Sequence, residues 1–392
     1  MSQSSGRPAI RPEQHAARLA GAQALANAQG LAALLIGVGA DLRYFTGYNA
    51  LPLERLTMLM IPASGAPRLV VPRLEAAPAR GCAAAAAGHV EVSTWEETED
   101  PVALVARLVH GIPGNADDRG IRIAVSDRLW AMFVLRLQAA LPLAHFTLGS
   151  AVSRELRIVK DPEEVELLRT AALAADRVIE QIATGRLAGR SEADVSQEIR
   201  DRLVAEGHDY GEFAIVGSGP NSASPHHEAS GRVIRPGEPI VLDIGGPLAG
   251  YGSDTTRTIW VTGGDPALGP DPEFLRIYEL VRRAHAEAIS AVRPGCPAES
   301  IDAVAREVIT DGGYGPQFMH RVGHGIGLEG HEDPYLVAGN AEPLRAGMAF
   351  SIEPGIYLEG RYGVRIEDIV ICGEAGPIVL NESSRDLRIV DG

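Results

Sequence analysis

An internal repeat in the second half is the feature that most constrains the fold of this 392-residue chain. The segment "IRPGEPIVLDIG", residues 234–245, aligns with "LRAGMAFSIEPG", residues 344–355, so that Asp243 matches Glu353 and glycines match glycines. Upstream, "GRSEADVSQEIRDRLVAEG" and "GCPAESIDAVAREVITDGG" match each other as helical segments. We therefore predict two copies of a helix, turn and strand unit, related by pseudo-twofold symmetry.

Each copy carries two acids next to apolar runs. Asp243 follows "PIVL" and Glu353 follows "AFSI", and across a glycine-rich segment come Asp254 in the first copy and Glu367 in the second. If each copy is a hairpin, its two acids face each other across neighbouring strands. Four buried carboxylates would cost many kcal/mol unless cations neutralised them. Matched positions in two repeats favour a site over the ordinary interpretation of each acid as a turn or solvated residue.

Two divalent ions would supply the matching charge, and oxygen ligands with one imidazole suit Mn(II), Fe(II), Co(II) or Zn(II). In "VGHGIGLEGHEDP", residues 322–334, His324 lies between two glycines and is the candidate imidazole. Glycine is unfavourable inside strands, so this segment is predicted to be a loop or short edge strand. The glycines indicate that the backbone of this segment passes close to another group, and a metal ion is one candidate for that group.

The first part of the chain has a different pattern of apolar residues. Short apolar runs, "LAALLIGV", "LTMLMIP", "RLVVP" and "IRIAVS", alternate with helical patterns, which predicts an α/β arrangement. Near Ser150 the pattern changes, and "KDP" at residues 160–162 marks the start of an amphipathic helix. We predict two domains, residues 1–152 and 153–392. The aromatics of "GADLRYFTGY", residues 39–48, fit either a substrate-binding wall or core packing.

Composition limits the partners. With 51 acidic against 36 basic side chains the formal charge is -15, which argues against a nucleic-acid or anionic-membrane partner. The three widely separated cysteines, without a C-x-x-C pair, indicate a reduced, cytoplasmic setting. The start of the chain lacks the apolar core of a signal peptide, and no run reaches the length of a membrane span.

Four motifs in order, "LDIGGPLAGYGSDTTRT", "HRVGHGIGLEGHEDP", "SIEPGIY" and "GVRIEDIV", resemble those of the pita-bread-fold metallopeptidases. This family includes methionine aminopeptidase, Xaa-Pro aminopeptidase and prolidase, with creatinase as a metal-free relative. The resemblance implies an α/β (α+β) chain with an N-terminal creatinase-like domain and a C-terminal pita-bread catalytic domain. It implies two divalent ions, Mn(II) before Co(II), Zn(II) or Fe(II), and these ligands: Asp243, Asp254, His324, Glu353 and Glu367.

The same resemblance implies catalytic residues. It assigns "GSGPNSASPHH" to the segment that carries a catalytic histidine, placed at His226, with His227 as the open alternative. His331 resembles the family's substrate-contacting histidine, and Glu353 would act as general base and acid. Arg365 shares a strand face with Glu367. It would support the acids or the substrate, or form only a structural ion pair.

The N-terminal half resembles a domain that plain methionine aminopeptidases lack, which points to the Xaa-Pro branch. We therefore expect hydrolysis of the bond between an N-terminal residue and proline, in a dipeptide or a longer peptide, by a homodimer. Tyr357, Tyr362 and the aromatics of residues 39–48 are candidates for a proline pocket. The alternatives are hydrolysis of a small amide or cyclic amidine, of the ectoine or creatine type, and a non-catalytic binding protein on the same scaffold.

Overall fold

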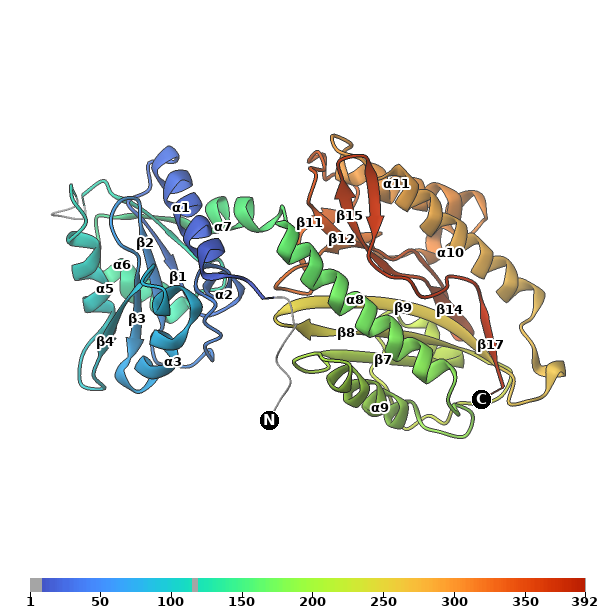
Figure 1. Ribbon diagram of the computed structural model, residues 1–392. Coiled ribbons are helices and arrows are strands. Elements are labelled where there is room, and N and C mark those ends of the chain that lie inside the picture. Colours follow the sequence, from blue (N-terminus) through green and yellow to red (C-terminus); the bar gives the residue numbers. More distant parts are fainter. Residues whose placement is uncertain (1–8, 115–118, 392) are drawn as a thin grey trace. The chain divides into compact units, whose positions relative to one another are not determined.

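The computed structural model describes residues 9–114 and 119–391 (Figure 1). The chain divides into two compact units, Ile10–Arg157 and a second unit from Ile158 onward. The boundary expected after residue 152 lies inside helix α7 (Ser150–Arg157), and the division between the units lies at the C-terminal end of that helix. Each unit is built around its own sheet or sheets.

The N-terminal unit contains a six-stranded mixed sheet in the order β4-β3-β2-β1-β5-β6. The four apolar runs of the sequence form its central strands, as predicted. β1 pairs in parallel with β5 and antiparallel with β2. The strands are β1 (Ala33–Ile36), β2 (Met58–Pro62), β3 (Arg68–Pro72), β4 (Glu91–Trp95), β5 (Arg122–Val125) and β6 (His145–Leu148).

Helices surround this sheet, and one face of it forms a core with α5 and α6, where Leu35, Val70 and Ile123 meet Val105 and Leu137. The helices are α1 (Pro12–Ala28), α2 (Ala40–Thr46), α3 (Ala76–Gly81), α4 (Ala83–Ala86), α5 (Pro101–His110) and α6 (Ala131–Ala140), followed by α7.

The aromatics of residues 39–48 belong to the interior of this unit. Phe45 is fully buried, the Tyr44 hydroxyl donates to the Leu156 carbonyl at 3.0 Å, and the Tyr48 hydroxyl donates to Glu75 at 3.3 Å. The structure therefore favours core packing over a substrate-binding wall.

The second unit shows the predicted repeat, with its helical parts in α9 (Glu192–Ala205) and α11 (Ala298–Asp311). In the first copy, β8 (Glu238–Leu248) and β9 (Tyr251–Val261) form one long hairpin. In the second copy, β12 (Ala349–Ile352) pairs with β15 (Asp368–Gly373), but the residues between them form a separate small sheet. The predicted second hairpin is thus interrupted.

Two curved sheets result, ordered β17-β9-β8-β7 and β11-β10-β12-β15-β16, with β13 and β14 paired on their own. Helices α8 and α9 pack against the first sheet, while α10 and α11 pack against each other and the second (Figure 1). The remaining elements are α8 (Pro162–Ala183), α10 (Pro272–Ala291), β7 (Phe213–Ser218), β10 (Gly323–Gly325), β11 (Glu332–Leu336), β13 (Gly355–Leu358), β14 (Tyr362–Arg365), β16 (Gly376–Val379) and β17 (Arg388–Val390). This is the predicted pita-bread architecture.

Helix α8 begins where the sequence predicted. The Asp161 side chain accepts a hydrogen bond from the Glu164 backbone at 2.8 Å, and the Glu164 side chain accepts one from the Asp161 backbone at 3.0 Å. Pro162 occupies the first helical position, where a missing N–H costs nothing.

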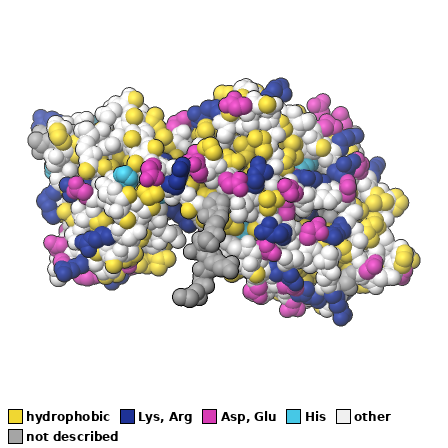
Figure 2. Space-filling view, viewed as in Figure 1, with side chains coloured by type: hydrophobic (Ala, Val, Ile, Leu, Met, Phe, Trp, Pro, Cys, Tyr) yellow, Lys and Arg dark blue, Asp and Glu magenta, His cyan; other side chains and the backbone are white. Residues whose placement is uncertain are grey.

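One face of the molecule is visibly mixed in charge. On the face shown in Figure 2, Lys and Arg side chains lie among Asp and Glu side chains. Within residues 9–114 and 119–391, no helix has the combination of length and apolar character that crossing a membrane requires. Cys82, Cys296 and Cys372 are buried thiols.

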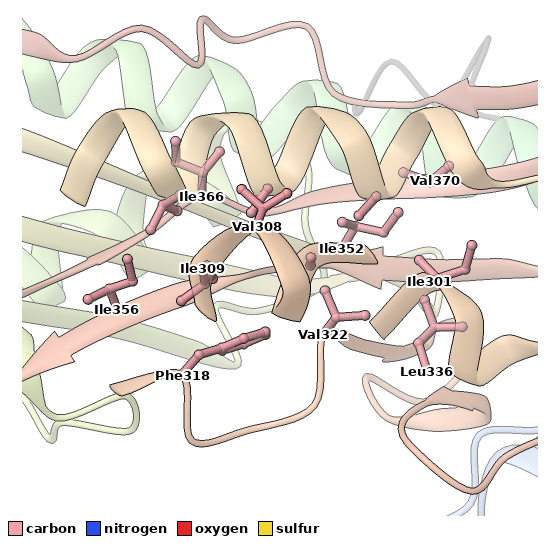
Figure 3. Packing of buried hydrophobic residues seen from close by; sticks show 14 of the residues in the cluster. Ile301, Val308, Ile309, Phe318, Val322, Leu336, Ile352, Ile356, Ile366 and Val370 are labelled. Atoms are coloured by element: carbon pink, nitrogen blue, oxygen red, sulfur yellow. The ribbon is translucent and has the colours of Figure 1, made fainter. Parts of the chain in front are cut away.

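The core of the second copy depends on α11, whose Ile301, Val308 and Ile309 pack toward the strands that lead to the site (Figure 3). Ile301 is fully buried, whereas Leu275 on α10 is 45% exposed. We expect Ile301→Ala to lower the free energy of unfolding by about 2–5 kcal/mol, through lost burial and a residual cavity. Leu275→Ala should change it by about 0.5 kcal/mol or less. Urea denaturation of both variants tests this, and equal effects would contradict the packing.

Candidate metal centre

The strand registers bring the four predicted acids to one place. In the first hairpin Asp243 lies opposite Thr256, and Asp254 lies opposite Gly245, so the two acids are diagonal neighbours on one face. The expectation that they face each other directly is therefore only approximately met. In the second copy, Glu353 and Glu367 flank the end of the β12–β15 ladder. A bridge between Thr256 and Glu367 joins the two copies.

Three overlapping groups of side chains place their ligand atoms within 4.8 Å of one another. All five residues predicted as metal ligands take part, and His331 joins them. The groups are Asp243, Asp254 and Glu367; His324, Glu353 and Glu367; and Asp254, His324 and His331. Adjacent triads that share members are an arrangement suited to two neighbouring cations.

His324 presents one ring nitrogen to the acids. Its Nδ1 donates to the Gly325 carbonyl at 3.1 Å, while Nε2 lies 3.4 Å from Glu353 Oε1 and 3.6 Å from Asp254 Oδ2. Burial and the neighbouring His331 lower the pKa of His324 to about 3. The ring is therefore neutral, with the lone pair of Nε2 directed at the carboxylates, as in a metal-binding histidine.

The glycines around His324 have a structural explanation. A side chain at Gly323 would overlap the Ser351 carbonyl of β12, and one at Gly325 would overlap the Asp333 carbonyl of β11. The close approach inferred from the sequence is thus between neighbouring strands, and a metal ion is not needed to explain it. The glycines let β10 lie between β11 and β12, which places His324 at the centre of the site.

The acids carry an excess of negative charge. Burial, together with the charges of Glu367 and Asp243, raises the pKa of Asp254 well above its usual range. Burial and the charge of Glu353 do the same to Glu367. Asp243 Oδ1 is buried without a hydrogen-bond partner. An orphaned buried oxygen among repelling carboxylates is the arrangement expected of residues that bind cations, so this donor set fits a metal centre.

Neighbouring side chains hold the acids in place. Arg365 Nη2 donates to Asp243 at 2.5 Å, the Thr256 hydroxyl donates to Glu367 at 2.6 Å, and the Ser351 hydroxyl donates to Glu353 at 3.3 Å. For Glu353, burial outweighs the lowering effect of Arg365 and raises the pKa to about 7. Glu353 can therefore exchange a proton near neutral pH.

Arg365 also leads to two residues whose roles the sequence did not predict. Its Nη1 donates to the Tyr357 hydroxyl at 2.8 Å, and that hydroxyl donates in turn to His320 Nε2 at 2.9 Å. His320 begins the "HRVGHG" motif, but no spacing rule distinguishes it from an ordinary loop histidine. Tyr357 is thus a buried linker to Arg365.

Tyr362, the other tyrosine suggested for a proline pocket, lies elsewhere. Its ring packs edge-on against Phe274, with centroids 5.3 Å apart, and its hydroxyl donates to Asp271. Tyr362 is therefore a core residue of the second unit.

The three histidines that the sequence suggests as catalytic candidates, His331, His226 and His227, differ in their surroundings. The His331 ring stacks on His324, with centroids 3.6 Å apart, and its Nδ1 accepts from Arg321 at 3.2 Å. His226 is exposed in a turn, near enough for its charge to lower the pKa of both His320 and His331. His227 Nε2 instead lies 2.8 Å from the buried carboxylate of Glu192. This contact gives His227 a structural partner, whereas His226 is the one whose charge acts on His331.

A curved two-lobed α/β catalytic unit with adjacent carboxylate and imidazole triads defines a metal-dependent hydrolase. The description "Metallopeptidase family M24" matches residues 166–374, and "Creatinase/Prolidase N-terminal domain" matches residues 18–159. The chain belongs to metallopeptidase family M24.

Relatives match it over almost the whole chain. "Probable dipeptidase PepE" of Mycobacterium bovis is 45% identical over 379 residues, covering 96% of this chain and 97% of that protein. "Xaa-Pro dipeptidase" of Lactobacillus helveticus is 35% identical over 352 residues, covering 88% and 92%. The crystal structure of dipeptidase PepE from Mycobacterium ulcerans has a TM-score of 0.89 at 45% identity, covering 98% of this chain and 100% of that one. These similarities favour a peptidase over a small-amide hydrolase or a binding protein.

The buried Glu192 generates a prediction on pH. Burial would raise its pKa, but hydrogen bonds from Ser230, His227 and Ser218 prevail and lower it to about 2. Because the folded-state pKa lies below the ordinary 4.5, the ionised carboxylate stabilises the fold above about pH 4.5, and this contribution is lost as the pH falls toward 2.

The free energies of unfolding of wild type and Glu192→Gln, both chelator-treated, should therefore differ by a constant amount at neutral pH. The difference should shrink below about pH 4.5. Denaturant titrations across the acid range measure it. A difference that stays constant down to about pH 3 would contradict the lowered pKa.

Proposed function

We propose that this protein is a two-metal dipeptidase that hydrolyses the bond between an N-terminal residue and proline. The observation that carries the hydrolase part is the set of buried, mutually repelling carboxylates around His324 with an unpartnered Asp243 oxygen. The names of the M. bovis and L. helveticus relatives support a dipeptide substrate, and the second also supports proline.

Five residues are proposed to hold two divalent ions: Asp243, Asp254, His324, Glu353 and Glu367. Bound ions would supply Lewis acidity, which activates water as a nucleophile and polarises the scissile carbonyl. Mn(II) is the proposed metal, with Co(II), Zn(II) or Fe(II) as substitutes that suit the same oxygen and imidazole donors.

Side chains of the protein orient the proposed metal ligands and transfer protons. Arg365, Thr256 and Ser351 fix the orientation of three of the acids by the hydrogen bonds described above. Glu353, whose carboxylate lies among the proposed ligands, takes a proton from the attacking water on a carboxylate oxygen and delivers it to the leaving nitrogen.

Two histidines are proposed to contact the substrate. His331 is exposed beside His324, with Arg321 donating to its Nδ1, so Nε2 is the ring atom available to a substrate carbonyl. His226 is exposed and close enough to interact electrostatically with His331. Together they would stabilise the developing oxyanion and position the peptide.

An Xaa-Pro bond explains why a dedicated enzyme is useful. The bond is a tertiary amide without an N–H, so sites that bind an extended backbone through that donor accept it poorly.

We also propose a homodimer, from the family resemblance, and a cytoplasmic setting, which the three buried free thiols support.

The metal assignment predicts distinct losses for distinct residues. Purified protein should bind about two divalent ions per chain, and chelation should abolish an activity that Mn(II) or Co(II) restores. Asp254→Ala and His324→Ala should lower the metal content, because each removes a ligand. His331→Ala should retain both ions yet lose about 10²-fold or more in kcat, the scale of a removed transition-state donor. Elemental analysis with steady-state kinetics measures this.

Two results would contradict the metal assignment. Full activity in protein shown by elemental analysis to be metal-free would exclude the two-metal mechanism. Loss of metal from His331→Ala would instead make His331 a ligand, as its place in one of the triads allows.

The substrate proposal predicts a preference at the second position. With metal supplied, kcat/KM for Ala-Pro should exceed that for Ala-Ala by at least about tenfold, the scale of one well-shaped pocket contact. Ala-Pro should also exceed Ala-Pro-Ala if the enzyme is a dipeptidase. Equal rates on Ala-Pro and Ala-Ala would replace the proline preference with a general dipeptidase. Turnover of ectoine or creatine without peptide cleavage would refute the peptidase proposal.

A further inference from the structure

Glu192 is a buried carboxylate outside the candidate metal centre. It accepts several hydrogen bonds from a single segment of the chain. It is the first residue of α9, and none of its side chain is exposed. Its oxygens accept hydrogen bonds from Ser218 N (2.8 Å), Ser218 Oγ (2.7 Å), Asn221 Nδ2 (3.0 and 3.1 Å), His227 Nε2 (2.8 Å), Ser230 N (3.2 Å) and Ser230 Oγ (2.7 Å). All of these donors lie in residues 218–230, which we call the His226 segment.

The His226 segment reaches the metal centre from its other side. Arg365, which binds Asp243, also donates from Nη2 to the Pro225 carbonyl at 3.2 Å. His226 is thus held between two fixed neighbours. The Pro225 carbonyl before it is bound by Arg365, and the His227 ring after it is bound by Glu192.

We infer that Glu192 is a positioning residue, which holds the His226 segment so that His226 faces the substrate. This rests on the substrate-contacting role proposed for His226. Glu192 itself touches no substrate, because it is fully enclosed by its own hydrogen-bond donors. A carboxylate is needed here because an ionised carboxyl only accepts hydrogen bonds, and every partner donates. A glutamine would turn an NH₂ group toward one of these donors.

The test is a double-mutant cycle on the full, metal-loaded protein with Ala-Pro as substrate. Glu192→Gln should retain two ions per chain and lower kcat/KM about tenfold or more. In the His226→Ala background the same change should alter kcat/KM less than about twofold, since an effect that acts through His226 cannot be lost twice. Effects of equal size in both backgrounds would overturn the inference.

Asp176→Asn is the matched control. Asp176 on α8 is also a buried, hydrogen-bonded carboxylate, but it accepts from Glu382 N at 2.5 Å and from Ser383 Oγ at 2.7 Å, outside the His226 segment. Any loss it causes should be the same with and without His226. If Glu192→Gln does not fold, Ser230→Ala removes a single donor to Glu192 and should show a smaller loss that again depends on His226. Independence from His226 would count against the inference.

A spectroscopic measurement separates this inference from the proposed function. In chelator-treated protein, the ring C–H resonances of His226, assigned by their absence in His226→Ala, should shift in Glu192→Gln, while those of His15 in the N-terminal unit should not. Wild-type protein that cleaves no Xaa-Pro peptide would refute the proposed function. His226 resonances that stay in place in Glu192→Gln would refute the positioning role of Glu192, whatever the substrate is.

Discussion

The repulsion among buried carboxylates is the constraint on which the catalytic unit depends. Asp243, Asp254 and Glu367 bring carboxylate oxygens within 4.8 Å of one another inside the protein, where Arg365 pairs with one of them. Such a cluster needs strands that hold it rigidly and a neutralising charge, which protons supply while the pKa values of Asp254 and Glu367 are raised and which bound cations would supply in their place. The long β8–β9 hairpin supplies rigidity on one side, and the β12–β15 ladder supplies it on the other. The repeat is therefore the means by which two rigid pairs of acids meet.

Two arginines hold the end of the second acid pair in place through the Glu367 carbonyl and Asp368. Arg257 donates to the Glu367 carbonyl at 2.7 Å and to Asp368 at 2.7 Å, and Arg385 donates to Asp368 at 2.7 Å. Here each charge has a partner of opposite sign, and Asp368 has a lowered pKa in spite of its burial, with Arg257 the largest lowering influence. Glu367, one residue earlier, has a raised pKa. Adjacent acids thus differ because Asp368 is paired with cationic side chains, while Glu367 is buried beside the carboxylates of Glu353 and Asp243.

The sequence predicted the internal repeat and the gathering of the acids because both depend on patterns repeated along the chain, whereas the pita-bread fold was implied by the family resemblance. Apolar runs with matched acids at Asp243 and Glu353 identify two equivalent strands without knowledge of how they pair. The sequence did not predict the separate β13–β14 sheet or the link from Arg365 through Tyr357 to His320. These depend on packing and long-range hydrogen bonding, which leave no periodic signal. The glycines of "GHG" indicate a close approach of the backbone, but their spacing does not identify the strands that they approach.

The site combines two kinds of support. The acids and His324 lie in or beside paired strands, so their positions are fixed by ladder hydrogen bonds that involve no side chain. His226 lies in a turn without such a ladder, and the segment around it is bound to Glu192 instead, by side chains as well as backbone N–H groups. A change at Glu192 should therefore disturb substrate contacts before it disturbs metal binding. The candidate metal centre and the histidine proposed to contact the substrate can then vary independently, which would allow one rigid metallohydrolase core to serve different substrates.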